Sequence, residues 1–475
     1  MKKTKVVCTI GPASEQKETL EKLIGTAGMN VMRMNFSHGD YEEQGFRIQN
    51  VKALNAEHGW NTGMMLDTKG PEIRTGYLEN DEPVLLHTGD ILRITMDYSY
   101  LGNAKKVAIS YPGLYDDISV GGRILVEDGN LTLKVIEKDA SCKELVCEVQ
   151  NDRKLKNKRN CNVPGVILNM PYISPKDKAD IEFACDQGLD FIAASFVRRP
   201  DDIKQIRDIL AAKGNDHIKI ISKIENQEGV SNMAKIIELS DGVMVARGDL
   251  GVDVDAWDLP AIQKEMIYLA QSTGKIVVTA TQMLDSMQQN PRPTRAEVSD
   301  VANAIYDRTT AIMLSGESAA GLYPLESVTA MKDIAEFTES DINFRNRFYT
   351  NNLNLGNDFL SAICNSAVNA AYQTEADAII CVTNHGQTAF KLSAYRPQCP
   401  IIAITVNEKA CRQLNLAWNV YPVYAEKKNS TDELFQYAID KALATGIVKK
   451  GDKVIITGAS TVGNAITDTI KLHIL

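Results

Sequence analysis

The chain has 475 residues, of which 44% are hydrophobic and 24% are charged, and its formal net charge at pH 7 is −9. This length exceeds one ordinary hydrophobic core, so two or three domains are expected, one of which could be a barrel of about 250 residues. The negative charge argues against a nucleic-acid or anionic-membrane partner, no apolar run is long enough for a membrane span, and nine scattered cysteines without a CxxC pair favour a cytoplasmic protein with reduced thiols.

The first part of the chain alternates short apolar strands with helices. We predict strands over residues 6–10, 31–36 and 64–66, and helices over residues 15–24 and 41–56. Ser14 is placed to cap the first of these helices.

The stretch from about residue 71 to residue 168 has a different pattern. Runs such as ILRITM and LTLKVIE alternate apolar with polar residues and are separated by Gly, Asn and Asp, which predicts an all-β module with a hairpin turn at residues 127–130. Because this module interrupts a strand–helix series, we interpret it as an insertion.

The strand–helix series then resumes. We predict strands over residues 191–195, 218–224, 242–246, 276–280 and 311–314, and helices over residues 176–187, 200–212, 229–239, 257–271 and 296–306. Counted from the start, eight short strands are each followed by a helix. Such alternation implies parallel strands with right-handed crossovers, and eight units close a (β/α)₈ TIM barrel.

A third module begins near residue 358, after a polar linker at residues 351–357. Its helices and its runs AIICV, PIIAITV and KVIITG predict a small open α/β sheet. The predicted division is therefore a barrel domain in two parts (1–70 and 169–345), an inserted β domain (71–168) and a C-terminal α/β domain (346–475).

Polar residues gather at the carboxyl ends of the predicted barrel strands, which is the rim where barrel enzymes carry their chemistry. They are Thr9, Arg33, Asn35, Ser37, Asp67, Thr68, Ser195, Lys223, Glu225, Arg247, Asp249, Thr281, Ser315 and Glu317.

The types of these residues suggest phosphoryl chemistry. Lys223 and Glu225 share one face of their strand, where a plain structural ion pair is the alternative interpretation. Glu225 and Asp249 end neighbouring strands and could place two carboxylates on one Mg²⁺, while Arg33 and Lys223 suit a phosphoryl group.

A second set of oxygens, from Asn35, Ser37 and Asp67, has one full charge and suits a monovalent cation. The glycines around Arg247 and Asp249 could also present bare backbone N–H groups to a carboxylate at a helix start.

The same segments carry a family resemblance. TIGPAS (9–14), RMNFSHG (33–39), LDTKGPEIRTG (66–76), IISKIEN (220–226), VARGDLG (245–251), ATQML (280–284), PRPTRAEVSDVANA (291–304) and MLSGESAAG (313–321) are similar to the motifs of the pyruvate kinase family, in the same order. The resemblance covers the whole chain, including the inserted and C-terminal modules.

The resemblance implies transfer of a phosphoryl group from phosphoenolpyruvate to ADP, the last step of glycolysis, by a homotetramer. It implies that Lys223, Arg33 and Thr281 are catalytic, that Gly248 and Asp249 also contact the substrate, and that Glu225 and Asp249 hold Mg²⁺ or Mn²⁺. It assigns K⁺ to Asn35, Ser37, Asp67 and Thr68, and Glu72 matches the potassium-dependent form of the family. It places ADP at Thr9, Pro12, Asn35, His38, Arg74, Asp128 and Lys158, with Asp128 on the inserted domain, which would close as a lid.

Three segments depart from the family pattern. RNCNVPG (159–165) replaces KGVNLPG and loses a glycine at the lid hinge, and Asp307-Arg308-Thr309-Thr310 replaces DGxD. The effector loop, usually TxSGxT, consists of Thr383, Asn384, His385, Gly386, Gln387 and Thr388, and GASTVGN (458–464) lacks an arginine that some relatives place on the effector. We therefore expect weak or altered activation by sugar phosphates.

Two other function classes remain open on the sequence. A Schiff-base aldolase or lyase also uses a barrel lysine, but it needs a neutral amine, which carboxylates near Lys223 oppose. A catalytically inactive binding protein would be expected to lack some of these residues.

Overall fold

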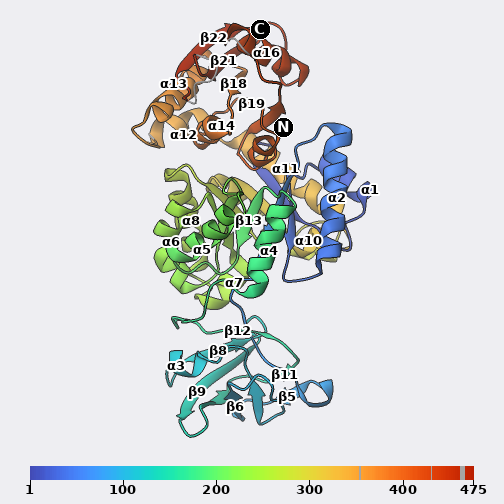
Figure 1. The fold of residues 1–475 in the computed structure, drawn as a ribbon, viewed down its shortest axis with the longest axis vertical. Coiled ribbons are helices and arrows are strands. Elements are labelled where there is room, and N and C mark those ends of the chain that lie inside the picture. The colour runs from blue at the N-terminus through green and yellow to red at the C-terminus, as the bar shows by residue number, and fades with distance from the viewer. Residues whose placement is uncertain (352, 354, 429–430, 461–465) are drawn as a thin grey trace.

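The computed structural model has three domains in a row, with the barrel between the inserted domain and the C-terminal domain (Figure 1). The structure describes residues 1–351, 353, 355–428, 431–460 and 466–475. Within those residues, no helix is both long and apolar enough to cross a membrane.

The eight predicted barrel strands form one closed parallel barrel, which confirms the predicted fold. Their order around the barrel is β1-β17-β16-β15-β14-β13-β3-β2. The strands are β1 Lys5–Thr9, β2 Val31–Asn35, β3 Gly63–Asp67, β13 Phe191–Ala194, β14 Lys219–Ile224, β15 Gly242–Ala246, β16 Ile276–Ala280 and β17 Ala311–Leu314. They are buried along nearly their whole length, as expected for β-branched strands covered on both faces.

Helices surround this barrel. They are α1 Lys17–Lys22, α2 Tyr41–His58, α4 Pro175–Asp186, α5 Pro200–Ala212, α6 Gln227–Leu239, α7 Arg247–Asp253, α8 Leu259–Ser272, α9 Arg295–Tyr306, α10 Gly316–Ala319 and α11 Pro324–Asp341, with a π-helical turn η1 at Leu23–Ala27 and a 3₁₀ turn η3 at Asp285–Gln288. The next helix, α12 Phe344–Asn351, packs against the C-terminal domain, where Phe348 contacts Tyr372. Capping boxes at Ser174 and Thr294 fix the starts of α4 and α9.

The predicted cap at Ser14 is wrong. Helix α1 begins at Lys17 with Gln16 in the cap position, and no side chain caps it. Ser14 lies instead in a turn in which the backbone N–H groups of Ser14 and Glu15 both donate to the Gly11 carbonyl. This turn delays the helix by about two residues.

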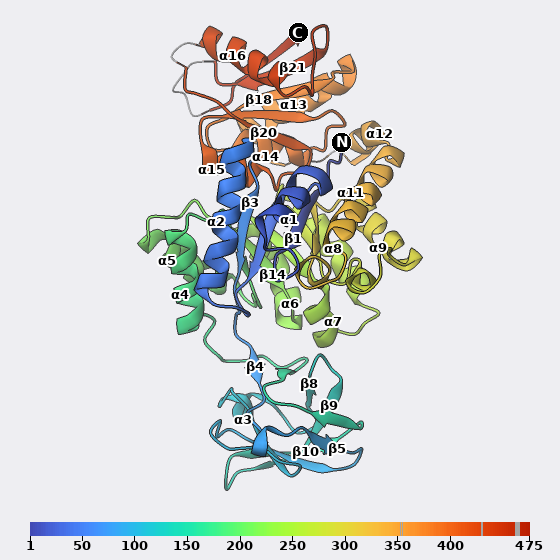
Figure 2. The ribbon, with the colours of Figure 1, turned by 90° about the vertical axis from the view of Figure 1, so that its right-hand side faces the viewer.

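The inserted domain hangs below the barrel and has its own hydrophobic core (Figure 2). Its seven-stranded sheet has the order β4-β12-β8-β9-β10-β6-β7, and β11 pairs with β5. The elements are β4 Ile73–Arg74, η2 Glu79–Asp81, β5 Val84–Leu86, β6 Ile91–Thr95, β7 Lys106–Ala108, α3 Leu114–Asp117, β8 Arg123–Val126, β9 Leu131–Asp139, β10 Glu144–Val149, β11 Arg153–Leu155 and β12 Asn160–Asn162. The turn at residues 127–130 joins β8 to β9, as predicted.

The C-terminal domain is a five-stranded sheet of order β20-β19-β18-β21-β22, in which only β22 is antiparallel. Its elements are α13 Phe359–Thr374, β18 Ala378–Val382, α14 Gln387–Ala394, β19 Ile401–Thr405, α15 Glu408–Leu414, β20 Val420–Tyr424, α16 Thr431–Ala444, β21 Lys453–Gly458 and β22 Thr469–Ile474. Part of the predicted linker, residues 352 and 354, lies outside the described residues.

The hydrophobic cores set the inserted domain apart from the rest of the chain, and the predicted boundary between barrel and C-terminal domain at residues 345 and 346 stays a proposal. The inserted domain has a core of its own, whereas one core runs from the barrel into the C-terminal sheet and includes Ile379 and Ile455. The barrel and the C-terminal domain are therefore packed as one continuous body, and the inserted domain is attached through narrow connections (Figure 2).

The two lost glycines have different consequences. Asn160, at the lid hinge, lies in an extended strand and pairs with Arg74, so a glycine is not needed there for its conformation. Arg308 has a left-handed φ of 79°, a conformation that a glycine would adopt at lower cost.

Candidate active site

Four charged residues from three barrel strands meet at the carboxyl-end rim. Arg33 Nε lies 2.6 Å from Asp67 Oδ2, and Lys223 Nζ lies 3.0 Å from both Asp67 Oδ1 and Glu225 Oε1. All four are almost fully buried, with exposed fractions of 8% or less. A buried cluster of this kind is stable only because each charge faces an opposite one.

The electrostatics of this cluster favour a permanently charged lysine. Burial lowers the pKa of Lys223, but the carboxylates of Asp67 and Glu225 outweigh burial and hold it above its usual value. Burial also raises the pKa of Asp67, and Arg33 and Lys223 outweigh that effect and keep it below its usual value. Lys223 is therefore an ammonium at neutral pH.

Glu225 is the member of the cluster that is not fully satisfied. Burial, together with the nearby Asp249 and Asp67, raises its pKa to about 7 against the opposing effect of Lys223. Its Oε2 accepts a 2.6 Å hydrogen bond from the Phe196 N–H, but its buried Oε1 receives no hydrogen bond of good geometry. An under-satisfied buried carboxylate beside a second one fits a divalent cation, which would take its remaining ligands from substrate and water. Among the described residues, no group of three or more protein ligands forms a closed metal cage.

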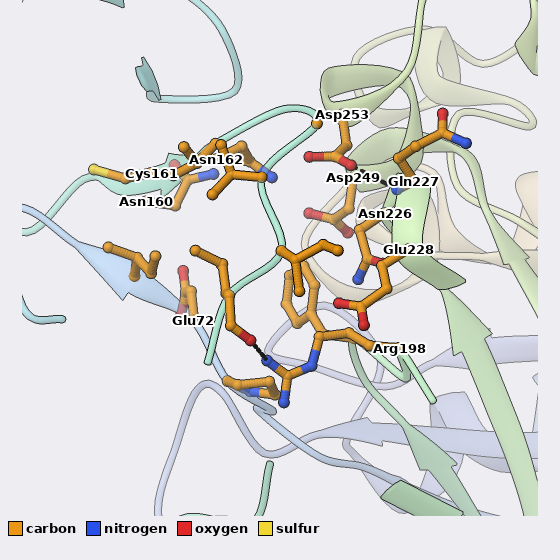
Figure 3. A pocket seen from close by; sticks show the side chains of 18 of the residues that line it. Glu72, Asn160, Cys161, Asn162, Arg198, Asn226, Gln227, Glu228, Asp249 and Asp253 are labelled. Carbon is orange, nitrogen blue, oxygen red and sulfur yellow. Dashed lines mark hydrogen bonds between the residues drawn. The ribbon is translucent and has the colours of Figure 1, made fainter. Parts of the chain in front are cut away.

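A cavity of about 320 Å³ opens between the rim and the hinge of the inserted domain (Figure 3). Asp249 projects into it from the start of α7, beside Asp253, and Glu72 faces them from the hinge. The inserted domain thus closes one side of the site.

The segment after β15 and the segment after β16 support each other. The Gly248 N–H donates a 2.8 Å hydrogen bond to Thr281 Oγ1, which itself donates to the Ala280 carbonyl. The Arg247 guanidinium is engaged in protein contacts, because it pairs with Asp300 at 2.6 Å and donates to the Thr281 carbonyl. Of the N–H groups expected to face a carboxylate here, that of Gly248 already has a partner, the Thr281 hydroxyl. The left-handed φ of Thr281, 64°, marks a backbone held under strain.

The four residues predicted to bind K⁺ lie at the ends of β2 and β3. Asn35 is opposite Asp67 in the strand register, and Asn35 Oδ1 accepts a hydrogen bond from the Ser37 N–H. Thr68 is buried, and its hydroxyl accepts from the Ser195 N–H. Both carboxylate oxygens of Asp67 already face cations, so Asp67 would have to share its charge with a potassium ion.

The residues predicted to contact ADP are divided between the barrel and the inserted domain. Thr9 is buried and accepts a 2.7 Å hydrogen bond from Arg33, whereas Pro12 and His38 are exposed near the rim.

The other predicted ADP contacts lie on the inserted domain or its hinge. Arg74 pairs with Glu72 at 2.8 Å, and its Nη1 donates to the Lys158 carbonyl. The Lys158 ammonium lies 4.2 Å from the centre of the Tyr77 ring. Asp128 is exposed on its turn, where Asn160 donates to it.

Two functional contacts were not anticipated from the sequence. Ser195 Oγ lies 2.8 Å from Lys223 Nζ and donates to Asp67, and the Phe196 N–H holds Glu225. Phe196 has a left-handed φ of 52°. A polar residue at the end of an apolar strand, such as Ser195, indicated a place on the rim. It did not indicate that Ser195 contacts Lys223 and Asp67.

The loop of residues 383–388 lines a second cavity, of about 620 Å³, in the C-terminal domain. The Gly386 N–H donates to Thr383 Oγ1, Thr388 Oγ1 is bonded to Thr467 Oγ1, and His385 Nδ1 is 3.5 Å from the Asn407 amide. Asn384 and Gln387 also line the cavity, together with Lys427 and Lys428. Residues 461–465 of the late loop lie outside the described residues.

Comparison with known proteins connects this geometry to a family. The family model described as pyruvate kinase, barrel domain, matches residues 1–328, and the pyruvate kinase alpha/beta domain matches residues 361–473. The chain is 49% identical to a pyruvate kinase of Bacillus licheniformis over 476 residues, covering 100% of this chain and 81% of that protein. It is also 49% identical to a pyruvate kinase of Geobacillus stearothermophilus, with 100% and 80% covered.

A solved structure agrees with the sequence comparison. The crystal structure of a pyruvate kinase from Cryptosporidium parvum superposes with a TM-score of 0.94 at 38% identity, covering 100% of this chain and 96% of that chain. These matches extend across all three domains. The chain therefore belongs to the pyruvate kinase family.

Proposed function

We propose that this protein catalyses transfer of the phosphoryl group of phosphoenolpyruvate to ADP, giving pyruvate and ATP. The observation that carries the proposal is the convergence of Arg33, Asp67, Lys223 and Glu225 at one mouth of the barrel. Phosphoryl transfer needs fixed positive charge around the migrating group and little covalent chemistry from the protein. The cluster supplies that charge in a buried and oriented form.

Each residue has a role that follows from its position. The Lys223 ammonium and the Arg33 guanidinium would neutralise the phosphoryl oxygens during transfer. Glu225 and Asp249 would hold Mg²⁺ or Mn²⁺, which when bound supplies additional positive charge on the phosphate and carboxylate oxygens of the substrate. Thr281 would help to deliver a proton to the enolate. A hydroxyl alone is a weak acid, so the proton would pass through the Thr281 hydroxyl and a water molecule.

A coupled assay of ATP formation from phosphoenolpyruvate and ADP tests the proposal directly. Pyruvate-dependent trapping by borohydride tests the Schiff-base alternative, which requires a neutral amine. The raised pKa of Lys223, caused by Asp67 and Glu225, opposes that alternative. Covalent labelling of Lys223 without ATP formation would overturn the proposed function.

Omission of K⁺ is expected to lower kcat by at least about tenfold, because the oxygens of Asn35, Ser37, Asp67 and Thr68 would lose their cation. In the structure Glu72 pairs with Arg74 at 2.8 Å and lies 3.9 Å from the Lys69 ammonium, so this position carries a carboxylate between two cations. The Glu72→Lys variant should recover activity without K⁺, because a fixed ammonium can replace the ion. Equal rates for the unmodified protein in K⁺ and in a bulky organic cation would contradict a potassium site.

Fructose 1,6-bisphosphate is expected to change the half-saturating phosphoenolpyruvate concentration by less than about tenfold. The loop offers Thr383, Gly386 and Thr388 to a phosphate at the start of α14, but Thr383 and Thr388 already have hydroxyl or N–H partners. Saturation curves with and without the sugar phosphate measure the effect. A larger decrease would show a fully functional effector site.

We also propose a cytoplasmic homotetramer. All nine cysteines are free thiols in the structure, which suits a reducing compartment. The edge strand β22 exposes Leu472 and Ile474, with 59% and 67% of their surfaces accessible, and an unpaired apolar edge favours association with another copy. Light scattering after size exclusion should give about four times the 52.3 kDa chain mass.

A further inference from the structure

Asn160 stands where the family pattern has a glycine, and its side chain contacts the turn that carries Asp128. Nδ2 of Asn160 donates a 2.7 Å hydrogen bond to Oδ1 of Asp128. The backbone joins the same two segments, because the Glu127 N–H donates to the Asn160 carbonyl over 3.0 Å. Asn160 therefore holds the 127–130 turn through both its backbone and its side chain.

The sheet places Asn160 between two residues predicted to contact the nucleotide. Strand β12 lies between β4 and β8, with Asn160 opposite Arg74 and Cys161 opposite Val126. Arg74 is thus on one side of Asn160, and the turn with Asp128 is on the other. Asn160 also lines the cavity between the inserted domain and the barrel (Figure 3).

The turn is well fixed and lies close to the barrel rim. Glu127 pairs with Arg153 at 2.8 Å, and the Asn130 amide donates to the Glu127 carbonyl over 2.7 Å. A Cβ atom built on Gly129 would lie 3.9 Å from Cγ1 of Val252 in α7. Helix α7 also carries Asp249, so the 127–130 turn lies beside the helix that holds one of the candidate cation ligands.

The Asp128 carboxylate itself is exposed and depends on one side chain for its orientation. Among the described residues, Asn160 is the only side chain that hydrogen-bonds to it. A carboxylate that is free to rotate loses rotamer entropy when it binds a ligand, whereas one already held in place loses less. The hydrogen bond occupies Oδ1 and leaves Oδ2 open to a ligand.

We propose that Asn160 is a positioning residue that holds Asp128 ready for the divalent cation carried by an incoming nucleoside diphosphate. The proposal rests on the proposed function, because it assigns Asp128 to the nucleotide. A glycine at this position has no side-chain amide to donate. The hydrogen bond to Asp128 is therefore a feature of this chain and not of the family pattern.

The test measures binding of the Mn²⁺·ADP complex by calorimetry, without phosphoenolpyruvate, to the unmodified protein and to Asn160→Ala, Asn160→Gly, Asp128→Ala and the Asn160→Ala/Asp128→Ala double variant. Loss of the orientation that one solvent-exposed hydrogen bond gives to Asp128 predicts an affinity about three- to tenfold weaker for the Asn160 variants. The double variant should bind no more weakly than Asp128→Ala. In Asn160→Ala and Asn160→Gly the KM for ADP should rise by about the same three- to tenfold, while kcat and the KM for phosphoenolpyruvate stay nearly constant.

Two further variants separate positioning from a merely structural role. Asn162→Ala is the matched control, since Asn162 lies on the same strand and face and makes no side-chain hydrogen bond to another described residue. Asn160→Gln keeps the amide and should restore part of the affinity.

Unchanged Mn²⁺·ADP affinity in Asn160→Ala, an equal loss in Asn162→Ala, or independent losses from Asn160→Ala and Asp128→Ala would each overturn the inference. So would unchanged affinity in Asp128→Ala. Failure of the unmodified protein to form ATP would instead overturn the proposed function, so the two failures are distinguishable.

Discussion

Replacing Lys223 by Met is expected to lower kcat by about a thousandfold or more, because the charge that faces the migrating phosphoryl group is lost in a buried site. Methionine has a similar length and no charge, so the cavity stays filled. The Lys223 ammonium lies within 3.0 Å of Asp67, Ser195 and Glu225, and no other lysine makes these contacts among the described residues. Single-turnover kinetics with the coupled assay measure the loss.

The control for this variant is Lys219→Met at the opposite end of the same strand. Lys219 pairs with Asp241 at 3.4 Å and faces Phe390 of the C-terminal domain, far from the rim. It should retain nearly full kcat. Binding of Mn²⁺ should survive in Lys223→Met, since Glu225 and Asp249 remain. Retained turnover in Lys223→Met would exclude the role assigned to the ammonium.

Replacing Glu225 by Gln is expected to weaken Mn²⁺ binding by about a hundredfold, which corresponds to about 3 kcal/mol for the loss of one charged ligand in a buried site. The change keeps the shape of the side chain and its acceptor for the Phe196 N–H, so the fold should be preserved. Turnover at a fixed Mg²⁺ concentration should fall accordingly, and excess Mg²⁺ should restore part of it. Electron paramagnetic resonance of free Mn²⁺ gives the affinity.

Glu228→Gln serves as the matched control for that variant. Glu228 lines the same cavity three residues further along the chain, but its carboxylate is paired with Arg199. It should bind Mn²⁺ as the unmodified protein does. An equal loss of Mn²⁺ affinity in both variants would show that general negative charge, rather than ligation by Glu225, holds the cation.

Local sequence pattern was sufficient for the eight barrel strands and for the rim. The apolar runs at β14 and β15 are short and rich in Ile and Val, and their spacing by helices predicted parallel strands. Because parallel strands in a barrel all end at one face, the polar residue that follows each run had to lie on the same rim. That is why Lys223, Glu225 and Asp67 could be named together from the sequence.

Tertiary structure alone decided which rim residues face one another. Asp67 was predicted as a potassium ligand. In the structure it also forms ion pairs with both Arg33 and Lys223. Lys223 can reach Asp67 because only one strand, β13, separates β14 from β3 in the closed barrel. Arg247 is in the same sequence segment as Asp249 but turns toward Asp300. The period-two alternation of a strand fixes the face on which a side chain lies, but contacts across the barrel depend on strand order and register, which only closure of all eight strands determines.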